Sequence, residues 1–231
     1  MKKIGFLLVI AAAVVAFAAF IALSPPGRED VIDQEDRDEP QPTPIATLQE
    51  KLRLDWDSEG YADWPVAEVL AQASQIAYQP PFEAKSEFKQ LGFERVESFV
   101  DGSMIGYVVS LEDICIVVFR GTDDKSDWIA NLDRRSVNTD HGEIHRGFHD
   151  AYQRLRKQIV DIVGSEEPKH LWVTGHSLGG ALAVVCAYDL IENERRNVDG
   201  LVTFGQPMVA RSQMGEHLDD VLLEKWFASC W

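Results

Sequence analysis

The fold of this chain is decided by residues 171–183, which read LWVTGHSLGGALA. The first four residues are apolar or β-branched and predict a short buried strand. The next five, GHSLG, fit the pattern Gly-x-Ser-x-Gly, and a helical pattern of small apolar residues follows at once. A strand, a tight turn and a helix in this order put Ser177 on the turn itself.

The glycines around this turn meet a steric need. A serine on so tight a strand-to-helix turn takes a strained backbone conformation, so the residues two before and two after it can carry almost no side chain. Gly175, Gly179 and Gly180 fit that requirement. The Ser177 hydroxyl is then expected to stand clear of the sheet, beside N–H groups that favour developing negative charge. The alternative interpretation is a glycine-rich turn with an idle serine.

The composition limits the classes to which this protein can belong. The chain has 231 residues, of which 45% are hydrophobic, enough for the core of one domain with additions. Its formal net charge of −16 argues against a nucleic-acid partner, because phosphates would be repelled. Cys115, Cys186 and Cys230 indicate no disulfide framework, and the first two are expected to be buried apolar residues. The sequence shows no metal-ligand spacing and no phosphate-binding loop, so we expect neither a metal nor a cofactor.

The amino terminus predicts a membrane segment. Lys2 and Lys3 precede an uncharged apolar run that ends at Leu23, close to the ~20 residues that cross a bilayer as a helix. This length favours residues 1–23 as an uncleaved anchor, although the small residues at 16–22 leave a cleaved signal peptide open. The lysines should stay in the cytoplasm. The remainder would therefore be tethered on the extracytoplasmic side, or secreted if cleavage occurs.

An acidic, proline-rich stretch at residues 24–47 predicts a disordered linker, and the folded domain is expected over residues 48–231. Apolar periodicity predicts helices at 66–78, 148–163, 182–192 and 209–223, and strands at 93–100, 104–110, 114–119, 171–174, 200–204 and from 225 onward. Strands that alternate with helices predict an α/β fold with a mostly parallel sheet and helices on both faces. Right-handed crossovers would put the Ser177 turn at the carboxyl edge of this sheet.

Acyl transfer by a serine needs a nucleophile, a base with its orienting partner, and donors for the oxyanion. Ser177 is the candidate nucleophile, and the backbone N–H of Leu178, directly after it, is one candidate donor. The second donor must come from the end of another strand. The predicted strand at 114–119 runs on through Gly121 into a polar loop that opens with Thr122, which makes this loop the candidate source.

Four blocks in order now resemble a known family. They read VFRGT at 118–122 with DWIANL at 127–132, HRGF at 145–148 with AY at 151–152, VTGHSLGGALA at 173–183, and TFGQP at 203–207. With a similar first helix ending at Tyr78, residues 60–228 resemble the class 3 lipases, the fungal-lipase-like branch of the α/β-hydrolases. The resemblance implies hydrolysis of a lipid or small ester, with Thr122 as the second oxyanion donor and residues 123–132 as a lid. A charged surface helix is the alternative for that segment.

The resemblance also shows a departure. In class 3 lipases an Asp and then a His follow the serine, the Asp after a strand that here begins near Trp226, and the sequence ends at Trp231. His176 should project away from the attacking side, the resemblance gives His145 a structural role, and His217 shares one predicted helix with its nearby acids. Two interpretations stay open: a serine ester hydrolase represented by a shortened chain, and an inactive tethered binding module that keeps the lipase shell. A peptidase is a weaker third.

Overall fold

The computed structural model describes residues 44–52, 64–122, 135–222 and 226–230. The predicted membrane segment at 1–23 and the predicted lid at 123–132 lie outside the described residues. Among the residues described, none of the helices is both long enough and apolar enough to cross a bilayer. The first described helix, α2 (Pro44–Leu52), begins within the last residues of the stretch predicted as a linker.

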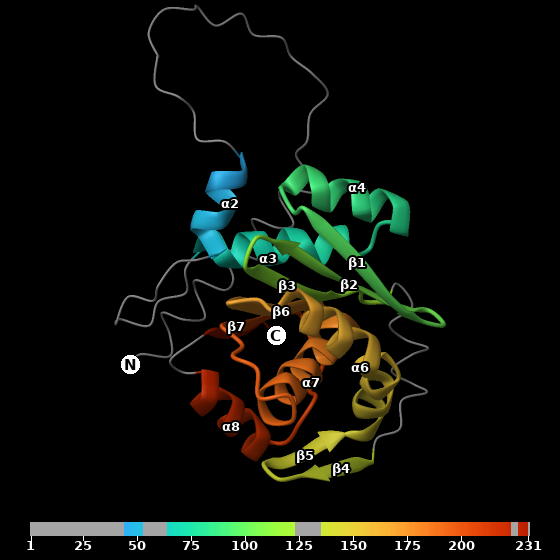
Figure 1. Ribbon diagram of the computed structural model, residues 1–231. Helices are drawn as coiled ribbons and strands as arrows, with labels where there is room; N and C mark the ends of the chain where they lie inside the picture. The colour runs from blue at the N-terminus through green and yellow to red at the C-terminus, as the bar shows by residue number, and fades with distance from the viewer. Residues whose placement is uncertain (1–43, 53–63, 123–134, 223–225, 231) are drawn as a thin grey trace, which may run out of the picture. The chain divides into compact units, whose positions relative to one another are not determined.

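Six strands form one sheet in the order β1-β2-β3-β6-β7-β8 (Figure 1). These are β1 (Arg95–Asp101), β2 (Met104–Leu111), β3 (Ile114–Phe119), β6 (His170–His176), β7 (Gly200–Phe204) and β8 (Trp226–Cys230). Pairing is parallel from β3 through β8, as predicted. It is antiparallel from β1 to β3, because the two-residue turns at 102–103 and 112–113 are too short for a crossover. The sheet is therefore mixed.

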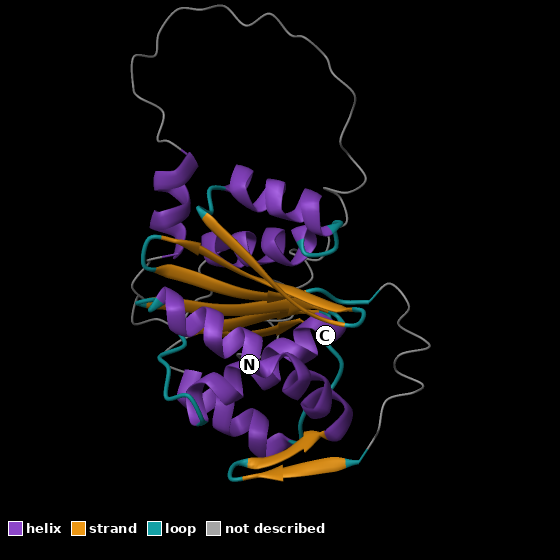
Figure 2. Cartoon of the chain, turned by 45° about the vertical axis from the view of Figure 1, so that its right-hand side comes forward, coloured by secondary structure: helices purple, strands orange, loops and turns teal. Residues whose placement is uncertain are grey.

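Helices cover both faces of the sheet, as expected (Figure 2). One face carries α2, α3 (Trp64–Ile76) and α4 (Pro81–Leu91), and the other carries α6 (Arg146–Glu166), α7 (Leu178–Glu192) and α8 (Ser212–Leu222). Strand β3 alternates between them, because Ile116 and Val118 pack on the first face whereas Val117 and Phe119 pack on the second. Burial on both sides explains why this strand reads as an unbroken apolar run.

Two elements were not predicted from the sequence. Pro80 and Pro81 end the preceding helix as expected, but Pro81 also occupies the first turn of α4, where its missing N–H costs nothing. The second is the hairpin of β4 (Ser136–Thr139) and β5 (Gly142–His145), whose strands are too short for a clear period. It is fixed beside the segment before α8 by the bond from the His145 N–H to the Val209 carbonyl, 2.8 Å.

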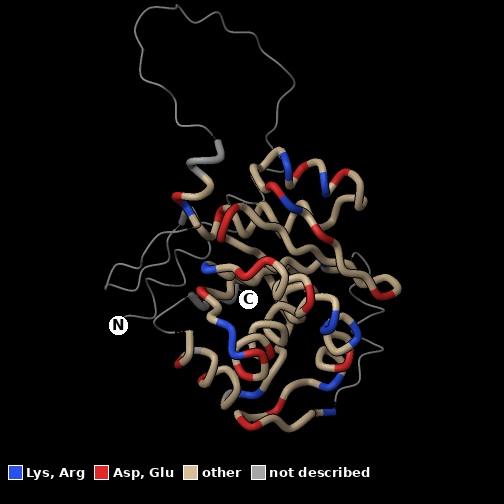
Figure 3. The backbone as a smooth tube through the Cα atoms, in the orientation of Figure 1, with Lys and Arg blue, Asp and Glu red and all other residues tan. Residues whose placement is uncertain are grey.

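Charge is arranged around an uncharged centre. Strands β3, β6 and β7 carry no Lys, Arg, Asp or Glu, whereas the outer helices and the loops carry many (Figure 3). Helix α7 packs against this centre, and thirteen successive residues from Leu178 to Leu190 are buried, all of them uncharged except Asp189 near its end. A helix buried on every side is a core helix, and this one starts directly after Ser177.

Candidate active site

Ser177 lies at the junction of β6 and α7 in an uncommon backbone conformation, with φ 56° and ψ −122°. Side-chain-bearing residues rarely adopt this combination, because it lies outside the helical, extended and left-handed helical wells. The Ser177 N–H donates to the Phe204 carbonyl of β7 at 2.8 Å, and the Ser177 carbonyl accepts from the Ala181 N–H at 3.2 Å. The predicted tight strand-to-helix turn is therefore confirmed, and it is tied to the neighbouring strand.

Backbone crowding explains the glycines of this turn. A Cβ added to Gly175 would lie 2.8 Å from the Gly180 nitrogen, and one added to Gly179 would lie 2.9 Å from the Arg120 carbonyl carbon. Real Cβ atoms essentially never approach other atoms so closely. The predicted steric need is confirmed, and the second contact shows that the first turn of α7 packs directly on the chain leaving β3.

The end of β3 runs beside the residue before Ser177. Phe119 pairs in parallel with Gly175, and a Cβ on Gly121 would lie 2.6 Å from the His176 carbonyl oxygen. Thr122, half-buried, is the next residue along. The three residues predicted for the site, Ser177, Leu178 and Thr122, thus come from two segments that pack backbone to backbone.

Leu178 opens α7, so its N–H is among the first four of the helix, which have no partner within the helix. The Ser177 N–H is engaged by Phe204. The next donor along the chain is therefore the Leu178 N–H, at the positive end of the helix dipole. This end of the helix suits an oxygen that gains negative charge.

Tyr78 was not predicted as a site residue, although it ends one of the similar segments. Its hydroxyl lies 2.8 Å from Nδ1 of His176, and the two rings are 5.7 Å apart. The imidazole of His176 is thus held toward the end of α3, in keeping with the expectation that His176 is not the base. Tyr78 also closes over Gly121, so it braces both segments of the site.

The other described histidines with acidic partners lie elsewhere. His170 begins β6, at the end opposite Ser177, 3.6 Å from Asp199. His149 pairs with its neighbour Asp150 at 2.9 Å on the exposed side of α6. His141 and His217 both meet Glu192, in the last turn of α7. The predicted Ser177 centre is therefore not joined by any of these pairs within the described part of the chain.

Cys115 and Cys186 are free and buried, as predicted. Burial raises the pKa of the Cys115 thiol, and it raises the pKa of the Cys186 thiol well above its usual range. A thiol must ionise to act as a nucleophile or metal ligand. Both are therefore packing residues.

A strained serine between a parallel strand and a buried helix, in a sheet covered on both faces, is the arrangement of the α/β-hydrolase fold. Residues 116–228 match the family described as Lipase (class 3). This segment, about half of the chain, belongs to the class 3 lipase family.

Known proteins agree with this assignment. A lipase from Rhizomucor miehei is 35% identical over 108 residues, covering 42% of this chain and 30% of that protein. The chloroplastic phospholipase A1-Igamma3 of Arabidopsis thaliana is 27% identical over 140 residues, covering 46% and 27%. The solved triacylglyceride lipase of Rhizomucor miehei shares the fold with a TM-score of 0.54 at 24% identity, over 68% of this chain and 66% of that one. The chain spans about a third or less of the length of these two curated relatives.

Proposed function

We propose that this protein is a serine ester hydrolase of lipase type, which cleaves a carboxylic ester of a lipid or a small molecule through an acyl-enzyme on Ser177. The observation that carries the proposal is the backbone of Ser177, held at φ 56° between glycines that leave no room for side chains. Such strain costs about 1–3 kcal/mol and persists where the surroundings enforce it, which is common at active sites. The relatives named lipase and phospholipase A1 support an ester of a lipid as the substrate class.

The reaction follows from the groups at the turn. Oγ of Ser177 attacks the ester carbonyl carbon while a base takes its proton, and the N–H groups of Leu178 and Thr122 stabilise the oxyanion. The base then passes the proton to the leaving alcohol, which departs as the acyl-enzyme forms. Water attacks this intermediate, releases the acid and restores the hydroxyl. Each oxyanion donor contributes roughly 10²–10³ to turnover in enzymes of this kind.

The base and its carboxylate partner, in this proposal, come from chain that follows β8. The register supports this, because His176 pairs with Phe204 and Phe204 pairs with Cys230 at the same edge of the sheet. Chain that leaves β8 therefore starts two strands away from Ser177. Without a base, binding and the oxyanion donors alone would leave roughly 10³–10⁴-fold catalysis over water.

A second candidate is a catalytically inactive binding module with a lipase shell. The positions of two histidines favour it, because neither is placed as a base for Ser177. His176 is held by Tyr78, and His170 lies at the end of β6 opposite Ser177. The two candidates differ in one measurable property, the dependence of ester hydrolysis on Ser177.

The test uses the 231-residue chain and a chain extended through the coding sequence downstream of residue 231. Each is assayed on chromogenic acyl esters of several lengths. The extended chain should hydrolyse them, and Ser177→Ala should lower turnover by about 10⁶-fold, to background. Ser165→Ala, an exposed serine of α6, should leave the rate unchanged. Hydrolysis that survives Ser177→Ala would contradict the mechanism, and lipid binding without hydrolysis by the extended chain would favour the binding module.

We also propose that residues 1–23 deliver the domain to the extracytoplasmic side, tethered to the membrane or secreted after cleavage. The charge-free run behind Lys2 and Lys3 supports this. Cell fractionation with protease accessibility tests it. Protein found only in the cytosol would contradict delivery, whereas protein in the medium would favour cleavage over the tether.

A further inference from the structure

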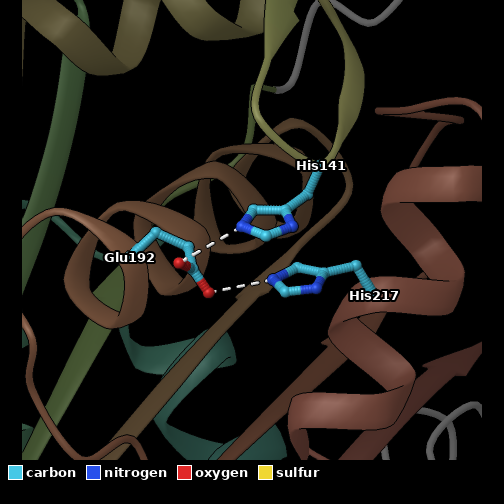
Figure 4. A group of neighbouring side chains, drawn as sticks. All are labelled: His141, Glu192 and His217. Carbon is cyan, nitrogen blue, oxygen red and sulfur yellow. Dashed lines mark hydrogen bonds and ion pairs between the residues drawn. The ribbon is translucent and has the colours of Figure 1, made fainter.

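His141, Glu192 and His217 gather at the carboxyl end of α7, from three different elements (Figure 4). His141 lies in the turn of the β4–β5 hairpin, Glu192 ends α7, and His217 lies on α8. Nε2 of His217 is 2.9 Å from Oε1 of Glu192, and Nε2 of His141 is 3.4 Å from Oε2. Both imidazoles thus turn the same nitrogen toward one carboxylate.

Two imidazole nitrogens and one carboxylate oxygen form a ligand set for a divalent transition metal, above all zinc. The three ligand atoms all lie within 4.8 Å of one another. In a tetrahedral zinc centre with bonds of about 2.0–2.1 Å, neighbouring ligand atoms are roughly 3.3–3.4 Å apart. The two nitrogen–oxygen distances, 2.9 and 3.4 Å, are close to that spacing. Because the two rings are stacked, one imidazole must rotate about its side-chain bonds to complete the geometry.

The two histidines are also stacked on each other. Their ring centroids are 3.6 Å apart with an interplanar angle of 6°. An imidazole nitrogen binds a metal through a lone pair that lies in the plane of its ring, so one ring must turn out of the stack before both can bind a single ion. The stacking shows that the β4–β5 hairpin and α8 hold the two side chains in contact with each other.

The surroundings limit how the rings can move and leave them accessible. The ring of Tyr188 is edge-on to both imidazoles, with centroids 6.2 Å from that of His141 and 6.4 Å from that of His217. The side chains of the three ligands are 16–35% exposed, so an ion can enter from solvent without opening the core. Arg195 approaches Glu192 at 3.6 Å, but its own side chain is mostly exposed and free to move into solvent.

We propose that His141, Glu192 and His217 bind a structural divalent transition-metal ion of the zinc class, which joins the β4–β5 hairpin and α8 to the end of α7. Water or the second oxygen of Glu192 would complete the coordination. At 1.5 Å per residue, the length of α7 separates the site from Ser177 by about 20 Å, so the ion takes no part in ester chemistry. Its role is to hold α8, the helix that leads into β8.

The experiment uses the complete chain, made without a histidine tag and stripped with a chelator. Zinc binding is measured by competition with a chromogenic chelator, and unfolding is followed by circular dichroism. We expect one zinc per chain and a melting temperature that rises with zinc. His217→Gln and His141→Gln should each weaken binding by roughly 100-fold or more, since even an outer-shell partner of a ligand contributes 10–100-fold.

Matched variants make the test specific. His149→Gln removes a histidine that pairs with the neighbouring Asp150, and Cys230→Ser removes the thiol of the third cysteine in the sequence; both variants should bind zinc like the parent. Ser177→Ala should also bind normally, which separates this proposal from the proposed ester chemistry. Cobalt(II) absorption of the parent chain reports tetrahedral coordination even if a histidine variant fails to fold. The absence of one-to-one binding, or equal binding by a folded His217→Gln, would overturn the proposal.

Discussion

The two ends of α7 are held in place by different physics. At the Ser177 end, glycine backbones touch the backbone of β3. At the other end, polar side chains from α6, α8 and the β4–β5 hairpin converge on Asp189 and Glu192. The Ser177 end is thus marked by close contact between backbones, and the other end by a cluster of polar side-chain contacts.

The polar end has a buried network of its own, besides the histidine cluster. The Tyr152 hydroxyl donates to Oδ2 of Asp189 at 2.7 Å, and Nε of Arg156 donates to Oδ1 at 3.0 Å. Asn193 donates to the same carboxylate at 2.7 Å. Burial, with the nearby Cys186 and Asp189, raises the pKa of Tyr152 far above its usual range. A substitution at this end therefore changes stability by altering hydrogen bonds and ionisation. A substitution at the Ser177 end changes stability by altering side-chain volume.

The largest expected effect comes from adding volume at the Ser177 end. Gly179→Ala would drive a methyl group into the backbone of Phe119 and Arg120, which cannot rotate away. We expect a loss of about 3 kcal/mol in the free energy of unfolding, at the upper end for overpacking, measured by urea denaturation. Gly215→Ala on α8, where an added Cβ meets nothing within 4 Å, should instead be neutral or stabilising by about 0.5–1 kcal/mol. Equal effects of the two substitutions would remove the contrast between the ends.

A smaller effect is expected from the polar end, and it depends on pH. Above pH 10, its ordinary pKa, Tyr152 ionises in the unfolded chain but keeps its proton in the folded one, where its pKa is raised. The unfolded state then binds fewer protons, so stability is fully present below pH 10 and falls as the pH rises further. The contribution is about 1.4 kcal/mol per pH unit.

Tyr152→Phe isolates this contribution. The variant should lose about 1 kcal/mol at neutral pH, because it lacks the hydrogen bond to Asp189. Its stability should then fall less steeply than that of the parent between pH 10 and 11, as followed by urea denaturation at a series of pH values. Parallel curves for parent and variant would show that Tyr152 titrates alike in both states.

The smallest expected change in stability tests whether the backbone of Ser177 is strained. Ser177→Gly relieves the conformation at φ 56° and ψ −122°, whereas Ser177→Ala keeps it and removes the same hydroxyl. Strain of about 1–3 kcal/mol, less the entropy that glycine adds to the unfolded chain, predicts that the glycine variant is more stable by about 1 kcal/mol. Calorimetry of the two variants measures the difference. An alanine variant more stable than the glycine variant by about 0.4–1 kcal/mol, the entropic cost of glycine alone, would mean that the turn stores no strain.

The same contrast explains what the sequence could predict. The Ser177 turn depends on four neighbouring glycine and serine positions, so its geometry follows from local sterics. The unbroken apolar run of β3 predicted a strand buried on both faces for the same kind of reason. Helix α4 and the hairpin were missed, because prolines that end one helix also stand at the start of the next and because β4 and β5 have four residues each.

The histidine cluster could not be predicted. His141, Glu192 and His217 are far apart along the chain, and each by itself is typical of a surface residue. Only the packing of α8 beside the hairpin, through contacts such as the Arg211 N–H to the Glu143 carbonyl at 3.1 Å, brings them together. Tyr78 was missed in part for the same reason, since its contact with His176 joins two distant segments.

The complete burial of α7 has a consequence for motion. A helix sheathed by core side chains along thirteen residues cannot slide or tilt unless the packing on that face of the sheet is dismantled. The serine in front of it therefore keeps a constant position. Any movement that admits a bulky substrate must therefore be made by the segments around α7. The Ser177 hydroxyl stays in place while they move.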